Sequence, residues 1–140
     1  MSMSVTAPQR ATIVPDERRL LFLPALFGSS LLMVAENAVY GFMERLSPLD
    51  YGGGFWDFYE CEGKPLFLAP RSKSRFRITG DITCFQGEVS AEAAGIIATM
   101  FAHSHLSFQF QSDLLSEGYG RLYAYSADHP EAAEIYQAID

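Results

Sequence analysis

The feature that most constrains the fold is an almost uninterrupted apolar run past the middle of the chain. Residues 93–102 hold alanines, isoleucines, a methionine and a phenylalanine, with one glycine, one threonine and no charge. Ser90 precedes the run as an expected helix N-cap, and Glu92 stands in the first turn. The run is too short to cross a bilayer, which takes about 20 residues. It therefore predicts a buried central helix over 91–103.

Short segments of β-forming residues precede this helix. They lie at 55–60, 66–69, 75–78 and 83–87, and Gly, Pro or Asp residues mark the turns between them. Such spacing is typical of an antiparallel meander of about four short strands. In the third segment polar Arg75 and Arg77 alternate with Phe76 and Ile78, as in a strand with one face in solvent.

Helical patterns flank the strands. Pro15-Asp16-Glu17 begins a first helix that should end near Leu23-Pro24, with Gly28 closing a short second turn. A second helix is expected over about 33–46, and its apolar residues form one stripe: Val34, Ala38, Phe42 and Leu46, filled in by Val39 and Met43. Two more are expected over 112–127 and from His129-Pro130-Glu131 onward, the last with Ile135 and Ile139 directed inward.

Composition completes the prediction of the fold. The 140 residues are 49% hydrophobic and 14% aromatic, which excludes a disordered chain and suffices for one core. Residues 1–12 are polar and are expected to be a flexible N-terminal arm, with a single domain over 13–140. We therefore predict an α+β fold, a single compact domain in which the meander packs with four to five helices.

Two features bear on the compartment. Residues 20–35 carry no charge and follow Arg18-Arg19, but Pro24 and Gly28 interrupt them and they are too few to span a bilayer, so we interpret them as core. Cys61 and Cys84 are the only cysteines and are expected to be reduced thiols. Both observations favour a cytoplasmic protein without a membrane partner.

Charge is distributed unevenly. The formal net charge is −7, yet residues 1–77 carry +1 and residues 78–140 carry −8. An acidic chain is repelled by phosphate, so direct nucleic-acid binding is not expected. The acidic half is either a solvated surface or a contact for a basic protein surface. The candidate contact residues lie on helices expected to face solvent: Glu117, Asp128, Glu131 and Glu134.

One basic run offers an alternative. Arg71, Lys73, Arg75 and Arg77 alternate with other residues beside aromatic positions, the local pattern of a nucleic-acid-binding strand. A solvated face, or an edge strand protected by charge, gives the same pattern. A nucleic-acid-binding regulator using residues 71–77 is therefore kept as the second hypothesis for function.

Catalytic and metal chemistry have little support. Gly52-Gly53-Gly54 leads into a predicted strand rather than a helix, unlike a phosphate loop. His103 and His105 are two residues apart, and on a helix this spacing points their side chains in different directions. No carboxylate accompanies them at a spacing typical of metal ligands. Asp57 and Glu88 could pair across strands, but exposed strand carboxylates are the favoured interpretation. We assign no catalytic residue, metal site or cofactor.

Several stretches together resemble the ArdB/KlcA antirestriction proteins, from about residue 12 to the end. They are Phe22-Leu23-Pro24 with Phe27-Gly28, Glu36 with Val39-Tyr40 and Met43, Asp50-Tyr51 with Gly53-Gly54, Trp56 and Phe58-Tyr59-Glu60, Ala69-Pro70, Phe85 with Gly87-Glu88, Ser90-Ala91 and Ala93-Ala94-Gly95-Ile96, and His129-Pro130-Glu131-Ala132. Residues 107–121 depart most from the pattern.

The resemblance implies a compact α+β domain of a fold peculiar to that family. It implies a protein of plasmids and other mobile elements that protects incoming DNA by inhibiting type I restriction–modification enzymes. The partner would be the restriction–modification complex or an associated host factor. No catalytic residue carries over, since the matched positions are mostly aromatic, Gly, Pro and Ala. The resemblance therefore predicts inhibition by binding.

Overall fold

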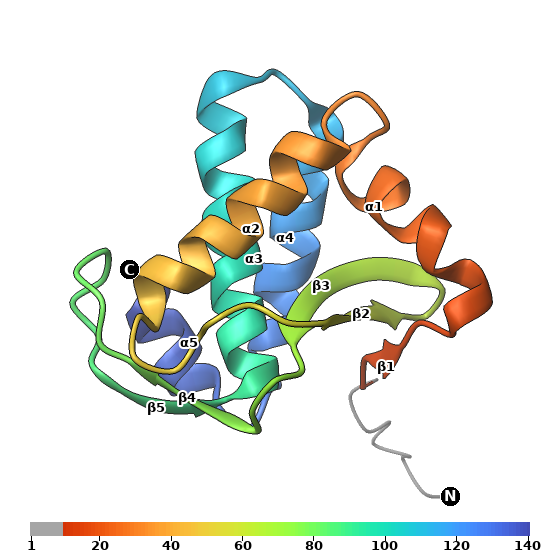
Figure 1. Cartoon of the computed structure of the whole chain (residues 1–140). Coiled ribbons are helices and arrows are strands. Elements are labelled where there is room, and N and C mark those ends of the chain that lie inside the picture. Colours follow the sequence, from red (N-terminus) through yellow and green to blue (C-terminus); the bar gives the residue numbers. More distant parts are fainter. Residues whose placement is uncertain (1–9) are drawn as a thin grey trace, which may run out of the picture.

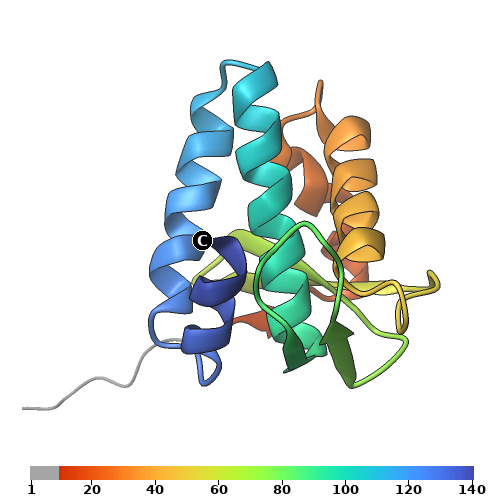
Figure 2. The same ribbon diagram turned by 90° about the vertical axis from the view of Figure 1, so that its left-hand side faces the viewer.

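The computed structural model describes residues 10–140, and helix α3 (Ala91–Gln109) runs through its centre. Helices α2 (Leu32–Leu46) and α4 (Asp113–Ser126) pack on either side of α3, as Figures 1 and 2 show from two directions. Helix α5 (Ala132–Ile139) packs against α3 as well. The Ser90 hydroxyl accepts a hydrogen bond from the Ala93 N–H at 3.1 Å. The buried central helix and its N-cap are therefore confirmed, but the helix continues to Gln109, beyond the expected end near His103.

The strands are divided between two small antiparallel sheets. β1 (Thr12–Ile13), β2 (Trp56–Cys61) and β3 (Lys64–Pro70) form a three-stranded sheet in that order. β4 (Arg75–Ile78) pairs with β5 (Gly87–Ser90) in the second sheet, below α3 in Figure 1. Together with the helices they make the expected single α+β domain.

The last strand lies further along the chain than expected, and the prediction of a strand over 83–87 is wrong. The Thr83 hydroxyl donates to the Ala138 carbonyl at 2.7 Å and accepts from the Phe85 N–H at 3.2 Å, which holds this segment as a loop. β5 begins at Gly87 instead, because Val89 is then fully buried opposite Phe76 of β4.

The first helix continues past its proline, so the expected end near Leu23-Pro24 is wrong. A 3₁₀ turn, η1 (Asp16–Arg18), leads into α1 (Arg19–Phe27). Pro24 cannot donate to the carbonyl of Leu20, but Leu20 is 91% exposed, so water can satisfy that carbonyl. Gly28 ends the helix with a φ of 90° and donates its N–H to the Pro24 carbonyl at 2.9 Å.

The apolar stripe of α2 is rotated relative to the prediction. Val39, Met43 and Leu46 are fully buried as expected, and Ala35 completes the buried face. Val34, which was expected on that face, is 48% exposed. The contact with α3 runs along the line from Ala35 to Leu46, which leaves Val34 on the outer side.

The two ends of the described chain are held by strand pairing, a hydrogen bond and apolar packing. Residues 1–9 of the expected arm lie outside the described residues, whereas Thr12 belongs to β1 and pairs with Glu60, so the sheet begins before the expected boundary. The Ala11 N–H also donates to the Tyr125 hydroxyl at 3.1 Å. At the other end α5 buries Ile135 fully, as expected.

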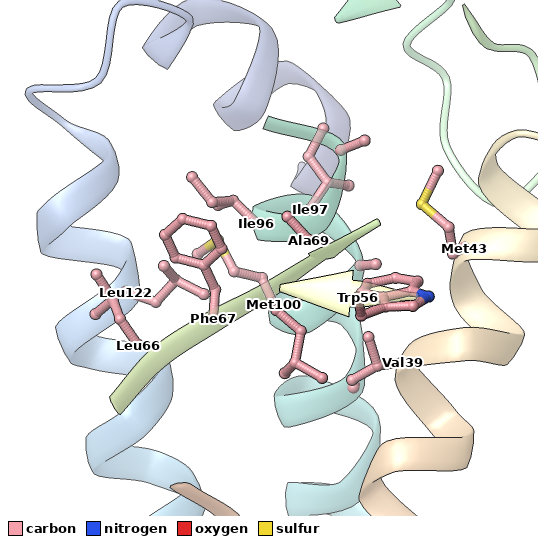
Figure 3. Packing of buried hydrophobic residues seen from close by; sticks show 14 of the residues in the cluster. Val39, Met43, Trp56, Leu66, Phe67, Ala69, Ile96, Ile97, Met100 and Leu122 are labelled. Atoms are coloured by element: carbon pink, nitrogen blue, oxygen red, sulfur yellow. The ribbon is translucent and has the colours of Figure 1, made fainter. Parts of the chain in front are cut away.

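The core lies between β3 and α3. Figure 3 shows the cluster that joins four elements: Ile96, Ile97 and Met100 of α3, Phe67 of β3, Trp56 of β2 and Val39 of α2. Gly95 allows this close approach, because a Cβ there would lie 2.2 Å from the Leu68 carbonyl oxygen. The Thr99 hydroxyl accepts from the Leu68 N–H at 3.3 Å, so the strand rests directly on the helix.

Within residues 10–140 no single helix is long and apolar enough to cross a membrane. The segments Asp16–Phe27 and Leu32–Leu46 reach the required length and composition only as a pair, and they are bent by 91° at the break between them.

Candidate functional site

The basic run follows β3 and enters β4 at the surface. The side chains of Arg71, Lys73, Arg75 and Arg77 are between 50% and 58% exposed. Phe76 and Ile78 are fully buried on the opposite face of β4. The alternation predicted from the sequence is therefore confirmed, and the four cations follow one another along β4 and the segment that joins β3 to it, which we call the basic edge.

Each cation of this run is paired with a carboxylate. Arg77 donates to Asp50 through Nε at 2.9 Å, Nη2 at 2.8 Å and its backbone N–H at 2.8 Å, and Lys73 approaches the same carboxylate at 3.4 Å. These bonds, the Arg77 side chain first, hold the pKa of Asp50 well below its usual range. Arg71 pairs with Asp57, and Arg75 Nε lies 2.6 Å from Glu88 Oε1.

These pairs weaken the nucleic-acid hypothesis. Asp50 and Asp57 are only 10% and 13% exposed and lie beneath the cations. Nucleic-acid affinity comes largely from cations that neutralise phosphates, and here the charges are already compensated. The expected cross-strand pair of Asp57 with Glu88 is wrong, because the two residues belong to different sheets and each has its own arginine.

The acidic candidates separate into two kinds. Glu117 and Asp128 are exposed, and Glu134 is half-buried. Glu131 instead accepts from the Ser90 N–H at 2.9 Å and from the Ser90 hydroxyl. The prediction that Glu131 faces solvent is therefore wrong, because its carboxylate joins the start of α5 to the N-cap of α3.

A second contact at the same place was missed by sequence reasoning. His129 is buried, and its Nε2 lies 2.8 Å from Glu92 Oε1. Its Nδ1 accepts from the Glu131 N–H at 3.0 Å, so the proton of the neutral ring is on Nε2 and is donated to Glu92. The residues are 37 positions apart, and only the acidic first turn of α3 hinted at such a partner. The contact fastens α5 to α3.

The other histidines have different surroundings. His103 is buried against Phe27, with ring centroids 5.0 Å apart, and burial lowers its pKa to about 4. His105 is exposed and lies 5.6 Å from the ring of Phe42. Within residues 10–140 no group of three or more His, Cys, Asp or Glu is placed to hold a metal ion.

The candidate residues thus fall into two charged surfaces, a basic one along β4 and the segment before it and an acidic one on and beside α4 and α5. In a comparison with known protein families, the sequence model of the antirestriction protein family matches residues 49–140. The chain belongs to the antirestriction protein family. It is 42% identical to an antirestriction protein KlcA of Escherichia coli, over 99% of this chain and 98% of that protein. A second antirestriction protein KlcA of Escherichia coli is 41% identical, over 95% and 96% respectively.

A solved structure from the antirestriction family shares the fold. It has a TM-score of 0.84 and 39% sequence identity, and the match covers 100% of both chains. That structure is of the KlcA and ArdB proteins, which are described as showing a novel fold and antirestriction activity against type I DNA restriction systems in vivo but not in vitro. The predicted family and α+β fold are therefore confirmed.

The stretch matched by the family model includes the candidate surfaces. All the contact residues predicted from the sequence lie inside the matched stretch 49–140. Asp50, which holds two of the cations, lies at its beginning, and α5 lies at its end. Both charged surfaces are thus built from the part of the chain that the antirestriction family model matches.

Proposed function

We propose that this protein protects incoming DNA from type I restriction–modification enzymes in cells, and that it does so by binding rather than by catalysis. The observation that carries the proposal is the full-length structural match to the KlcA and ArdB proteins. Those proteins act against type I systems in vivo but not in vitro. That difference supports a partner present in the cell and missing from a purified reaction.

The partner we propose is the type I restriction–modification complex or an associated host factor, met in the cytoplasm. Residues 78–140 carry a net charge of −8, and Glu117 and Asp128 expose their side chains to solvent. Such a field favours encounter with a basic protein surface. Glu134 is included in the same candidate surface, whereas the Glu131 carboxylate accepts a hydrogen bond from the Ser90 N–H.

The side chains considered for chemistry support binding over catalysis. Asp57 and Glu88 are held by separate arginines, so they do not form an acid–base pair. His103 is enclosed in the core, where it has no access to a substrate.

The function is tested by plating unmodified phage on cells that carry a type I system, with and without this gene. We expect plating to rise several-fold or more while methylation of the host DNA is unchanged. The assay should cover several type I systems, with expression confirmed by immunoblot. Equal plating with and without the gene in all of them would contradict the proposed function.

The surface is tested by converting Glu117, Asp128 and Glu134 together to Gln or Asn. Removing rim charges slows association with little effect on folding, so protection should fall while the melting temperature is kept. A matched control removes the same charge from Glu17, Glu44 and Glu62, which are exposed in the first half of the chain. Equal loss in both variants would point to net charge, and full activity of the first variant would exclude this surface.

A further inference from the structure

The three arginines at the basic edge donate through the same two nitrogens, Nε and Nη2. Arg71 and Arg77 each bind their carboxylate through both nitrogens. Arg75 binds the Glu88 carboxylate through Nε at 2.6 Å, and its Nη2 donates to the Glu88 backbone carbonyl at 3.3 Å. Within residues 10–140 no hydrogen bond involves Nη1 of these three arginines. A guanidinium binds carboxylates either side-on or end-on. The side-on position is filled here, and the end-on position is open in all three.

The carboxylates hold these guanidinium groups in place. Asp50 and Asp57 are largely buried, whereas the arginines that they bind are more than half exposed. Asp50 is itself fixed by the Arg77 backbone N–H as well as by its side chain. Ordering a long side chain costs binding energy, and this arrangement orders the arginines before any partner arrives.

Large apolar side chains are exposed beside the arginines. Leu49 is 63% exposed and Phe55 is 78% exposed. The Arg71 N–H donates to the Phe55 carbonyl at 2.9 Å, so Phe55 and Arg71 are neighbours. A shallow groove beside Leu49 is lined by Leu49, Asp50, Gly52, Gly53, Ser72 and Lys73. Arginine and aromatic residues are the types enriched at the energetic centres of protein interfaces.

We propose that this face, the arginine edge (Leu49, Phe55, Arg71, Arg75 and Arg77), is a docking surface for an acidic protein segment that also carries an apolar side chain. Carboxylates of the segment bind end-on to the open Nη1 and Nη2 donors. Its apolar side chain packs on Leu49 and Phe55. The residues of this surface belong to other elements than the acidic helices α4 and α5, and the proposal does not depend on antirestriction activity.

Charge favours a protein over a nucleic acid at this edge. Its cations lie directly above Asp50, Asp57 and beside Glu88, so a dense array of phosphates meets fixed negative charge as well as positive. A single carboxylate in an end-on position meets only the outward donors. Exposed Leu49 and Phe55 add contacts that a phosphate backbone does not use.

The test measures binding of a short fluorescein-labelled peptide of alternating glutamate and leucine by anisotropy at low and high salt. One variant, Leu49→Ser with Phe55→Ser, removes the apolar contacts. A second, Arg71→Lys with Arg75→Lys and Arg77→Lys, keeps each charge but removes the end-on fork. The matched control is Leu20→Ser with Phe108→Ser, since these residues are 91% and 88% exposed elsewhere on the surface. Short duplex DNA serves as the competing probe.

We expect salt-sensitive peptide binding that weakens at least about tenfold in both edge variants and is unchanged in the control. Absence of peptide binding, or equal binding by the folded serine variant, overturns the proposal.

If duplex DNA binds more tightly than the peptide and still binds after the lysine substitutions, the edge is assigned to nucleic acid instead. Self-association abolished by the serine variant assigns it to a second copy. If the serine variant does not fold, the lysine variant decides. If the wild-type protein does not raise phage plating, only the proposed antirestriction function is contradicted, because the peptide measurement tests the docking surface independently.

Discussion

Acid should destabilise this protein through one buried histidine. His103 is 1% exposed, and neither of its ring nitrogens has a hydrogen-bond partner among the described residues. Gly118 packs against the ring so closely that a Cβ there would lie 2.7 Å from His103 Cε1. Burial, and secondarily the charge of Arg121, lowers the pKa of His103 to about 4. The folded protein therefore keeps this ring neutral under conditions in which the unfolded chain protonates it.

The size of the effect follows from proton linkage. The ordinary pKa of the ring is 6.5, and a value of about 4 in the folded state corresponds to at most about 3 kcal/mol of unfolding free energy. Because the folded pKa lies below the unfolded one, this stability is fully present above pH 6.5. It falls as the pH drops from 6.5 towards 4, by about 2 kcal/mol at pH 5. This loss is a large share of the free energy of unfolding of a typical domain, which is about 5–15 kcal/mol.

The measurement is urea denaturation between pH 8 and pH 4.5 for the wild type and for His103→Leu. Leucine is similar in volume and has no proton to bind, so the variant should lose most of the change between pH 7 and pH 5. It should also be at least as stable at pH 7, because two unsatisfied nitrogens are removed. His105→Gln, which changes an exposed histidine, is the control and should follow the wild type. Parallel pH profiles for the wild type and His103→Leu would refute the reasoning.

Three further predictions concern packing and pairing. Gly95→Ala should destabilise the fold severely, because the new Cβ would overlap the β3 backbone at 2.2 Å, whereas Gly120→Ala has open space and should be neutral or stabilising by about 0.5–1 kcal/mol in urea denaturation. Ile97→Asp should abolish cooperative unfolding in calorimetry, because it buries an unpaired carboxylate, while Ile97→Val should cost only about 1 kcal/mol. Asp50→Asn should lower the melting temperature more than Glu88→Gln, because only the first pair has a largely buried carboxylate; equal shifts would contradict this ranking.

Local signals made the helices predictable. Ser90, an acidic first turn and an unbroken apolar run mark α3 without reference to the rest of the chain. The division of the strands into two sheets depends on distant residues. The outer edge of β4 is closed by the segment after α2, where the Ser47 hydroxyl donates to the Arg77 carbonyl at 2.7 Å and Asp50 accepts from its N–H. No pattern within 75–78 reveals that side chains, rather than a strand, cover that edge.

The charged surfaces were predictable only in part. The alternation of Arg75 and Arg77 is visible in the sequence, but the partner of Arg77 lies 27 positions away. Glu131 was expected to face solvent because helical periodicity describes only which side of a helix meets the core. It lies just before α5, where its side chain reaches the N-terminus of another helix. Sequence periodicity therefore finds charged faces and misses the pairs that neutralise them.

Pairing also explains why the two halves of the chain differ as surfaces. In the first half, arginines cover Asp50, Asp57 and Glu60. In the second half the only cation is Arg121, and its Nη2 donates inward to the Pro65 carbonyl at 3.1 Å. Within the described residues, seven carboxylates of that half have no ion-pair partner: Asp81, Asp113, Glu117, Asp128, Glu131, Glu134 and Asp140. The acidic field is therefore uncompensated on the C-terminal half, while the arginine edge presents ordered donors close to neutrality. Long-range attraction of a basic partner belongs to the first surface, and short-range recognition belongs to the second.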